Sequence, residues 1–276
     1  MKRLLQSLSV FILFISLVAQ ADIALLVHGY HSSGKAWRSS GIITQLKTKD
    51  WYDAGLFTPQ GYLAPLVDLS LHNAPMTNKG KYLVTAELPS EAPIEIQAAM
   101  LDKYLTYIHT HFPQQVIHLI AHSAGGIVAR LTLVNNYQQK APSHFNIFQL
   151  ITIATPHLGS PIAKMAHRAA NSPIGVIAPL VGANEINRAQ TLYQQLAQED
   201  KNPFLFLLNR QAHPPMYYTS IIRGNGSLLK GDWLVPPLSQ NMALVPAIGS
   251  HARAIITAGD HDLKYQDAII LMALLP

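Results

Sequence analysis

Hydrophobic residues along the chain gather in short continuous runs that alternate with stretches of helical spacing. Six runs have the length and composition of buried β-strands, at residues 23–27, 82–86, 116–120, 148–153, 217–222 and 254–257. An apolar residue recurs at every third or fourth position, as in an amphipathic helix, at residues 91–112. Further helices are expected at 126–137 and at about 264–274. Ser90 is the expected N-cap of the first helix. Alternating strands and helices predict the α/β class, a mostly parallel sheet with helices on both faces and sites at the carboxyl ends of the strands.

The segment 158–215 interrupts this alternation. It contains an apolar stretch at 174–181 and a stretch of helical spacing at 185–198. We interpret it as an insertion over the sheet, a small helical cap or lid. Ordinary connecting structure is the alternative, because helical insertions in this class do not always cover a site.

The first residues have the pattern of an export signal. Lys2 and Arg3 are followed by an apolar stretch at 10–19 and by Ala19-Gln20-Ala21, which fits a small-x-small cleavage pattern. A bilayer span needs about 20 apolar residues, so this stretch is short for a permanent anchor. We therefore predict a cleaved signal peptide at 1–21 and one domain at 22–276, with an uncleaved anchor as the alternative. The expected location is periplasmic, outer-membrane-associated or extracellular.

The composition of the chain excludes several kinds of site. The chain of 276 residues is 49% hydrophobic and 13% charged, which is enough for one large domain with a deep core. It contains no cysteine, which excludes disulfides, thiolate catalysis and cysteine-ligated metals. Its formal charge of +5 comes from scattered Lys and Arg. We therefore expect no nucleic-acid partner, while a weak, transient attraction to an anionic membrane surface stays open.

Ser123 stands between the predicted strand 116–120 and the predicted helix 126–137. A sharp strand-to-helix bend needs small residues on both sides of the bend residue, and Ala121 and Gly125 meet that need. This is the nucleophile-elbow pattern G-x-S-x-G with Ala in the first position. The bend would lift the serine oxygen above the sheet and place the amide of Ala124 at a helix start, where it can bind an oxyanion. The alternative is an ordinary turn that happens to contain a serine.

At this point the chain resembles the α/β-hydrolase superfamily, and within it the bacterial lipases (triacylglycerol lipase-like). The resemblance rests on "LLVHGY" at 25–30, "AHSAGG" at 121–126, "TIATPHLGSP" at 152–161, "GDWLVP" at 231–236 and "AGDHDL" at 258–263. It implies an α/β-hydrolase fold with a nucleophile, an acid and a histidine base in the chain order Ser, Asp/Glu, His. A serine hydroxyl needs such a base at neutral pH.

The resemblance assigns the nucleophile to Ser123, the acid to Asp232 and the base to His261. It also places the other half of the oxyanion hole in the "HG" loop after the first strand, at the backbone amide of Tyr30, opposite that of Ala124. The family usually has Gly where Trp233 stands. Gly29 making a simple turn, and Asp232 being an ordinary turn aspartate, are the alternatives.

Two histidines follow Asp232, and the predicted strand 254–257 separates them. A strand rises about 3.3 Å per residue, so His251 and His261 would lie about 13 to 20 Å apart along the sheet. A base must reach within about 3 Å of the serine oxygen, which stands at the carboxyl end of its own strand. Only His261 is on that edge.

Other acids and histidines fit these roles less well. Asp260 and Asp262 flank His261 and neighbouring residues rarely face each other, Asp68 precedes Ser123, and Glu185 lies in the insertion. We interpret the remaining histidines near the motifs as packed or hydrogen-bonded side chains, namely His28, His118, His122 and His157.

The sequence contains no zinc-binding pattern such as H-E-x-x-H, so we expect no catalytic metal and no cofactor. Some related lipases carry a structural calcium, and Asp260, Asp262 and Asp267 could contribute to one.

The leading functional prediction is an exported serine hydrolase that cleaves carboxylic esters, with lipid acyl esters as the expected substrates. An acyltransferase or thioesterase with the same three residues is one alternative. A catalytically silent binding or folding factor with a lipase-like fold is the other.

Overall fold

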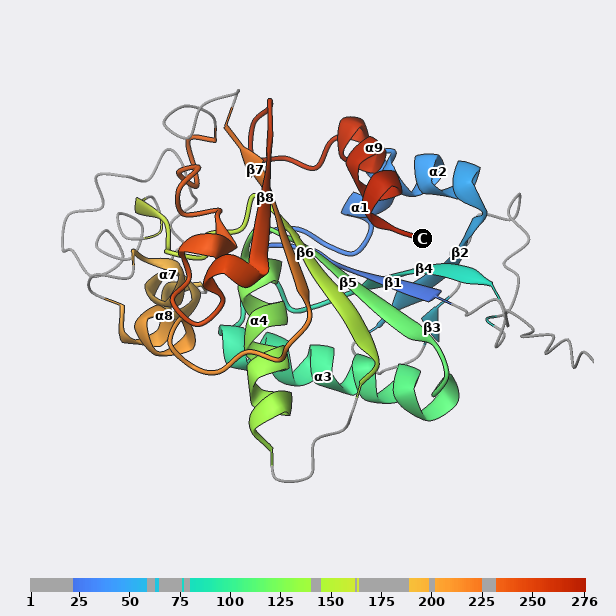
Figure 1. Ribbon diagram of the computed structural model, residues 1–276, viewed down its shortest axis with the longest axis horizontal. Coiled ribbons are helices and arrows are strands. Elements are labelled where there is room, and N and C mark those ends of the chain that lie inside the picture. Colours follow the sequence, from blue (N-terminus) through green and yellow to red (C-terminus); the bar gives the residue numbers. More distant parts are fainter. Residues whose placement is uncertain are drawn as a thin grey trace, which may run out of the picture.

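One sheet organises the molecule, with strand order β3-β2-β4-β1-β5-β6-β7-β8 (Figure 1). The computed structural model describes residues 22–58, 63–64, 76, 80–139, 145–161, 163, 189–198, 202–224 and 232–276. Its strands are β1 (Asp22–Val27), β2 (Trp51–Phe57), β3 (Leu63–Ala64), β4 (Lys81–Ala86), β5 (Val116–His122), β6 (Ile147–Ile153), β7 (Tyr217–Arg223) and β8 (Ala252–Thr257). All neighbouring strands pair in parallel except β2 and β3, which are antiparallel.

Helices cover both faces of the sheet (Figure 1). On one face α3 (Ile94–His111) packs against α4 (Ala124–Gln138), and on the other α2 (Ile42–Leu46) packs against α9 (Tyr265–Leu274). The remaining helical segments are α1 (Ala36–Ser39), α7 (Gln190–Leu196), α8 (Pro203–Leu208) and the short 3₁₀ turns η1 (Lys47–Lys49), η3 (Met242–Leu244) and η4 (Gly249–His251). This arrangement confirms the predicted α/β architecture.

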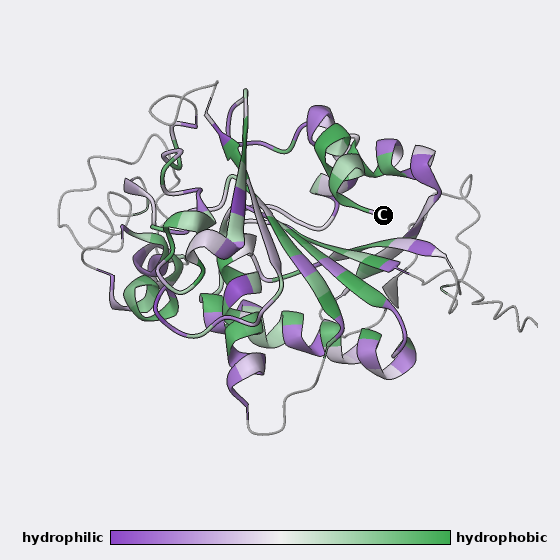
Figure 2. Ribbon diagram, viewed as in Figure 1, coloured by the Kyte–Doolittle hydropathy of each residue, from purple (hydrophilic) through white to green (hydrophobic). Residues whose placement is uncertain are grey.

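Alternation of side chains along the strands divides the core in two. Ile23, Leu25 and Val27 of β1 belong to the cluster under α3 and α4, whereas Ala24 and Leu26 belong to the cluster under α2 and α9. All of these side chains are fully buried. Figure 2 shows hydrophobic residues dominating the central strands, while α3 alternates between hydrophobic and hydrophilic residues. A strand that is buried on both faces therefore has apolar residues at consecutive positions.

The structure corrects the predicted start of α3. The helix begins at Ile94, with Pro93 at the N-cap position, and not after Ser90. A proline disfavours the α conformation in the residue before it, so Pro93 keeps Ala92 outside the helix.

The predicted set of strands omitted β2, whose sequence "WYDAGLF" is broken by Asp53 and Gly55. Asp53 is buried, and Arg38 donates two hydrogen bonds to its carboxylate, at 2.6 and 2.9 Å. A polar residue can lie in a buried strand when a distant partner satisfies it. That partner cannot be found from local spacing.

Several expectations fall on residues outside the described part of the chain. These are the signal peptide at 1–21, Asp68, and residues 164–188 of the predicted insertion, including Glu185. In the described part of the insertion, α7 and α8 are helical. Among the residues that the structure describes, no helix combines the length and apolar character that a membrane span requires.

Candidate active site

Ser123 forms the bend between β5 and α4. Its backbone has φ 52° and ψ −131°, a conformation that non-glycine residues adopt only under strain. The bend needs small neighbours, because a Cβ on Gly125 would lie 2.3 Å from the carbonyl oxygen of His28, and one on Gly126 would lie 2.2 Å from Oγ1 of Thr155. Gly125 thus lets the first turn of α4 pack directly against the loop after β1, and Gly126 lets it pack against the loop after β6.

The structure brings Ser123, His261 and Asp232 together at the carboxyl ends of the strands. Nε2 of His261 lies 2.7 Å from Oγ of Ser123, and Nδ1 of His261 contacts a carboxylate oxygen of Asp232. Because the carboxylate can only accept, Nδ1 carries the ring proton and Nε2 is left to accept from the serine hydroxyl. The arrangement meets the geometric requirement for a serine activated by a general base.

Asp232 is buried and held in place by its own loop. Its Oδ1 accepts hydrogen bonds from the amides of Leu234, at 2.8 Å, and Val235, at 3.1 Å, which leaves Oδ2 for His261. Trp233, at the position where related lipases usually have Gly, is 61% exposed. Its large side chain therefore reaches solvent without disturbing the turn.

His251 and His261 lie at opposite ends of β8. His251 ends η4, immediately before the strand, whereas His261 lies in the loop between β8 and α9. The structure therefore places His261, and not His251, beside Ser123, as the length of the predicted strand indicated.

The loop after β1 approaches Ser123 from the other side. A Cβ on Gly29 would lie 2.7 Å from Cβ and 3.2 Å from Oγ of Ser123, so only glycine allows this approach. Nε2 of the buried His28 accepts from the amide of Leu88 at 3.0 Å, and its Nδ1 donates to the carbonyl of Gly29 at 2.9 Å. Burial lowers the pKa of His28, which keeps the ring neutral in this role.

The two predicted oxyanion-hole residues both border the bend at Ser123. Ala124 is the first residue of α4, and the first amides of a helix have no acceptor within the helix. Tyr30 follows Gly29, and its hydroxyl lies 2.6 Å from that of Tyr193 on α7. The side chain of Tyr30 thereby links the loop after β1 to the predicted insertion.

A cavity of about 590 Å³ opens above Ser123 and His261. Part of its wall is apolar and comes from α7 and the loop after Asp232, with Leu196, Leu234 and Val235. Another part carries hydroxyl groups from the α1 region, including those of Ser39 and Ser40. In Figure 1, α7 and α1 lie on different sides of the strand ends, so the two parts are contributed by separate regions of the fold.

The other histidines named from the sequence are buried and hydrogen-bonded. His118 contacts the carboxylate of Asp22 at 3.2 Å, and His157 contacts the hydroxyl of Thr152 at 3.0 Å. His122 contacts the backbone carbonyl of His261 at 2.7 Å. Burial lowers the pKa of His122 to about 3 and that of His157 well below its usual value, so both rings stay neutral and neither replaces His261 as a base.

The three aspartates considered for calcium do not share a site. Asp267 is engaged with Arg223 through two hydrogen bonds of 2.7 and 2.6 Å, and Asp260 pairs with Lys264 at 2.9 Å. Within the described ranges, no three acidic or histidine side chains are grouped closely enough to hold a metal ion.

Comparisons with known proteins identify the family of the chain and its fold. Residues 21–169 match the family described as PGAP1-like alpha/beta domain. Triacylglycerol lipase 2 of Saccharomyces cerevisiae is 33% identical over 92 residues, which are 32% of this chain and only 27% of the yeast protein.

Solved structures share the fold. The mature form of Bacillus licheniformis lipase BlEst2 matches with a TM-score of 0.54 and 19% identity, over 93% of this chain and 92% of that one. Its propeptide form matches with a TM-score of 0.60 and 18% identity, over 94% of this chain and 51% of that one. The α/β-hydrolase fold expected from the sequence motifs is confirmed.

Proposed function

The chain belongs to the PGAP1-like alpha/beta domain family, and from its site we propose that it is a serine hydrolase that cleaves carboxylic esters, with lipid acyl esters as substrates. The observation that carries this proposal is the continuous hydrogen-bonded relay from Ser123 through His261 to Asp232 at the floor of a cavity. Such an arrangement is not expected by chance, since it joins a strained serine, a loop histidine and a buried carboxylate from three separate segments.

The relay supports a two-step reaction. Oγ of Ser123 attacks the acyl carbonyl while Nε2 of His261 takes the hydroxyl proton, and the same proton then passes to the leaving alcohol. The resulting acyl-enzyme is attacked by water, which gives its proton to His261 and releases the acid and the free serine. Asp232 orients the imidazole and stabilises its charged form. The amides of Tyr30 and Ala124 are proposed to bind the oxyanion in both steps.

Support for a lipid substrate comes from the cavity and from the relatives. The apolar residues Leu196, Leu234 and Val235 would accept an acyl chain, and the chain's relatives in yeast and Bacillus are named lipases. We further propose that the N-terminal segment 1–21 directs export, which would place the enzyme in the periplasm, on the outer membrane or outside the cell. Transient contact with a lipid interface is part of the same proposal.

The proposal is tested by turnover of p-nitrophenyl esters with acyl chains of two to sixteen carbons, using wild type and Ser123→Ala. We expect the variant to fold normally and to keep only residual catalysis, about 10³- to 10⁴-fold over water. Near-wild-type turnover by Ser123→Ala would refute the assignment.

Two further measurements separate the alternatives. Labelling of Ser123 by a fluorophosphonate is expected for an active enzyme and not for a silent binding protein. Product analysis with added acceptor alcohols distinguishes hydrolysis from acyl transfer, because only a transferase forms the new ester as its main product.

A further inference from the structure

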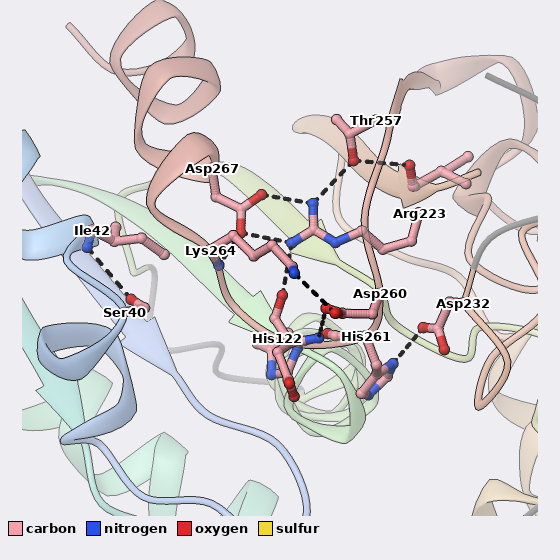
Figure 3. A network of polar contacts seen from close by, with 12 residues as sticks. Ser40, Ile42, His122, Arg223, Asp232, Thr257, Asp260, His261, Lys264 and Asp267 are labelled. Atoms are coloured by element: carbon pink, nitrogen blue, oxygen red, sulfur yellow. Dashed lines mark hydrogen bonds and ion pairs between the residues drawn. The ribbon is translucent and has the colours of Figure 1, made fainter. Parts of the chain in front are cut away.

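The loop that carries His261 is attached to the protein through two consecutive backbone carbonyls. The carbonyl of His261 accepts a hydrogen bond from Nε2 of His122 at 2.7 Å. The carbonyl of Asp262 accepts one from Nη2 of Arg223 at 3.1 Å. Figure 3 shows the guanidinium of Arg223 between Asp267 and this loop, His122 beside His261, and Asp232 at the ring of His261.

Both donors are themselves fixed. His122 is buried and ends β5, directly before Ser123. Arg223 ends β7, is 1% exposed, and donates to both carboxylate oxygens of Asp267 at 2.7 and 2.6 Å and to Oγ1 of Thr257 at 3.0 Å. The guanidinium is therefore bonded to both Asp267 and Thr257. Because its donors lie in one rigid plane, these bonds fix its orientation.

Asp267 closes this arrangement at the start of α9. It accepts the amide of Lys264 at 2.8 Å, in addition to the guanidinium of Arg223. The first turn of α9 is thereby tied to the end of β7, and the loop from Gly259 to Lys264 is held at both ends. Gly259, with φ 133°, gives this loop a backbone freedom that the buried contacts must restrict.

We propose that His122 and Arg223 are positioning residues for the general base, setting the place of the His261 ring through the carbonyls of His261 and Asp262. This inference rests on the proposed catalytic role of His261. Ring position matters because Nε2 must stay within hydrogen-bond reach of Ser123, and a displacement of about 1 Å can cost about 100-fold in rate. The pair Lys264–Asp260 also connects the loop to the start of α9, but it is exposed and water competes with it.

The Arg223 part is tested with Arg223→Lys and with the double variant Arg223→Met/Asp267→Leu. Lysine keeps the charge beside Asp267 but lacks the planar set of donors needed to hold the carboxylate and the Asp262 carbonyl together. We expect kcat to fall about 10- to 100-fold with little change in KM, and fluorophosphonate labelling of Ser123 to slow in parallel. The double variant removes both charges, so it is expected to keep the fold while kcat stays low.

The His122 part is tested with His122→Leu and His122→Gln. Leucine removes the donor to the His261 carbonyl, whereas glutamine retains an N–H that can reach it. We expect kcat to fall in the first variant and to recover in part in the second. In His122→Leu we expect kcat to fall while KM and the melting temperature change little, which loss of packing alone would not produce.

Asp260→Asn is the matched control, because it weakens the exposed pair in the same loop and leaves both buried donors in place. Its kcat is expected to equal that of wild type. Wild-type kcat in the double variant and in His122→Leu would overturn the inference, since the two side chains would then support only the fold. Activity surviving in Ser123→Ala would instead refute the proposed function, so the two failures are distinguishable.

Discussion

The close approach of Gly29 to Ser123 provides a direct test of how the site is assembled. Replacing Gly29 with alanine adds one methyl group at a point 2.7 Å from Cβ of Ser123, 3.0 Å from the carbonyl oxygen of His122 and 3.2 Å from Oγ of Ser123. Carbon atoms pack at about 3.5 to 4.0 Å, so the loop and the serine must separate by about 1 Å. Turning a flexible side chain cannot relieve the two shortest contacts, because Cβ of Ser123 and the carbonyl oxygen of His122 are fixed to the backbone.

A separation of that size is expected to lower activity far more than stability. Moving reacting groups by about 1 Å can cost about 100-fold in rate, which corresponds to about 2.7 kcal/mol of transition-state stabilisation. The loss should appear in kcat for p-nitrophenyl esters of every chain length, since the methyl group displaces the nucleophile and not the acyl pocket. Rates of fluorophosphonate labelling should fall in the same proportion.

Gly249→Ala is a suitable control, because a Cβ at Gly249 meets no atom within 4 Å. Its positive φ of 54° makes alanine mildly strained there, at a cost of about 1 to 2 kcal/mol, without any effect on Ser123. The control should therefore melt at a lower temperature and keep its kcat. If Gly29→Ala retained a kcat within about twofold of wild type, the reasoning that this loop is packed against the nucleophile would be wrong.

Three further predictions concern the general base His261, the half-buried His213 and the cavity residue Leu196. His261→Ala should abolish ester hydrolysis while His251→Ala keeps most of it, and the reverse result in the p-nitrophenyl assay would contradict the relay. The half-buried His213 accepts a hydrogen bond at Nε2 from Nε of Arg130 at 3.2 Å. Burial lowers the pKa of His213 to about 3, so the unfolded chain binds a proton below about pH 6.5 that the folded chain does not. The contribution of His213 to stability should therefore fall as pH drops from about 6.5 toward 3, by up to about 1.4 kcal/mol per pH unit, and thermal melts of His213→Gln should show a shallower fall. Leu196→Trp should shorten the accepted acyl chain, with kcat/KM decreasing about fourfold per excluded methylene; Leu207→Trp, at an exposed site on α8, should leave the chain-length profile unchanged.

Much of the fold was predictable because its central strands are buried on both faces. Six strands were found from continuous apolar runs, and the elbow was found because the bend at Ser123 tolerates only small neighbours. The strand β2 was missed because Asp53 interrupts its apolar run. Asp53 can be buried there only because it pairs with Arg38, fifteen positions earlier in the chain. Local periodicity carries no information on such a pairing.

The same distinction applies to the site. The elbow pattern identified Ser123 and the predicted strand end separated His261 from His251, but the family's chain order was needed for Asp232. The contributions of His122 and Arg223 could not be predicted, because each acts on a backbone carbonyl of another segment. The only available signal was an arginine ending an apolar strand at 217–222, where a buried charge needs a partner.

The described part of the insertion restricts how access to the site can be controlled. The side chain of Gln195 on α7 accepts the amide of Ile94, the first residue of α3, at 2.8 Å, and the hydroxyl of Tyr193 lies 2.6 Å from that of Tyr30. Leu196 of the same helix lines the cavity. An opening motion of α7 would therefore break a buried hydrogen bond to the core and pull on Tyr30, whose amide is proposed to bind the oxyanion. We infer that α7 is a fixed wall that sets chain-length preference, so a rise in activity at the substrate's solubility limit would have to originate in another part of the molecule.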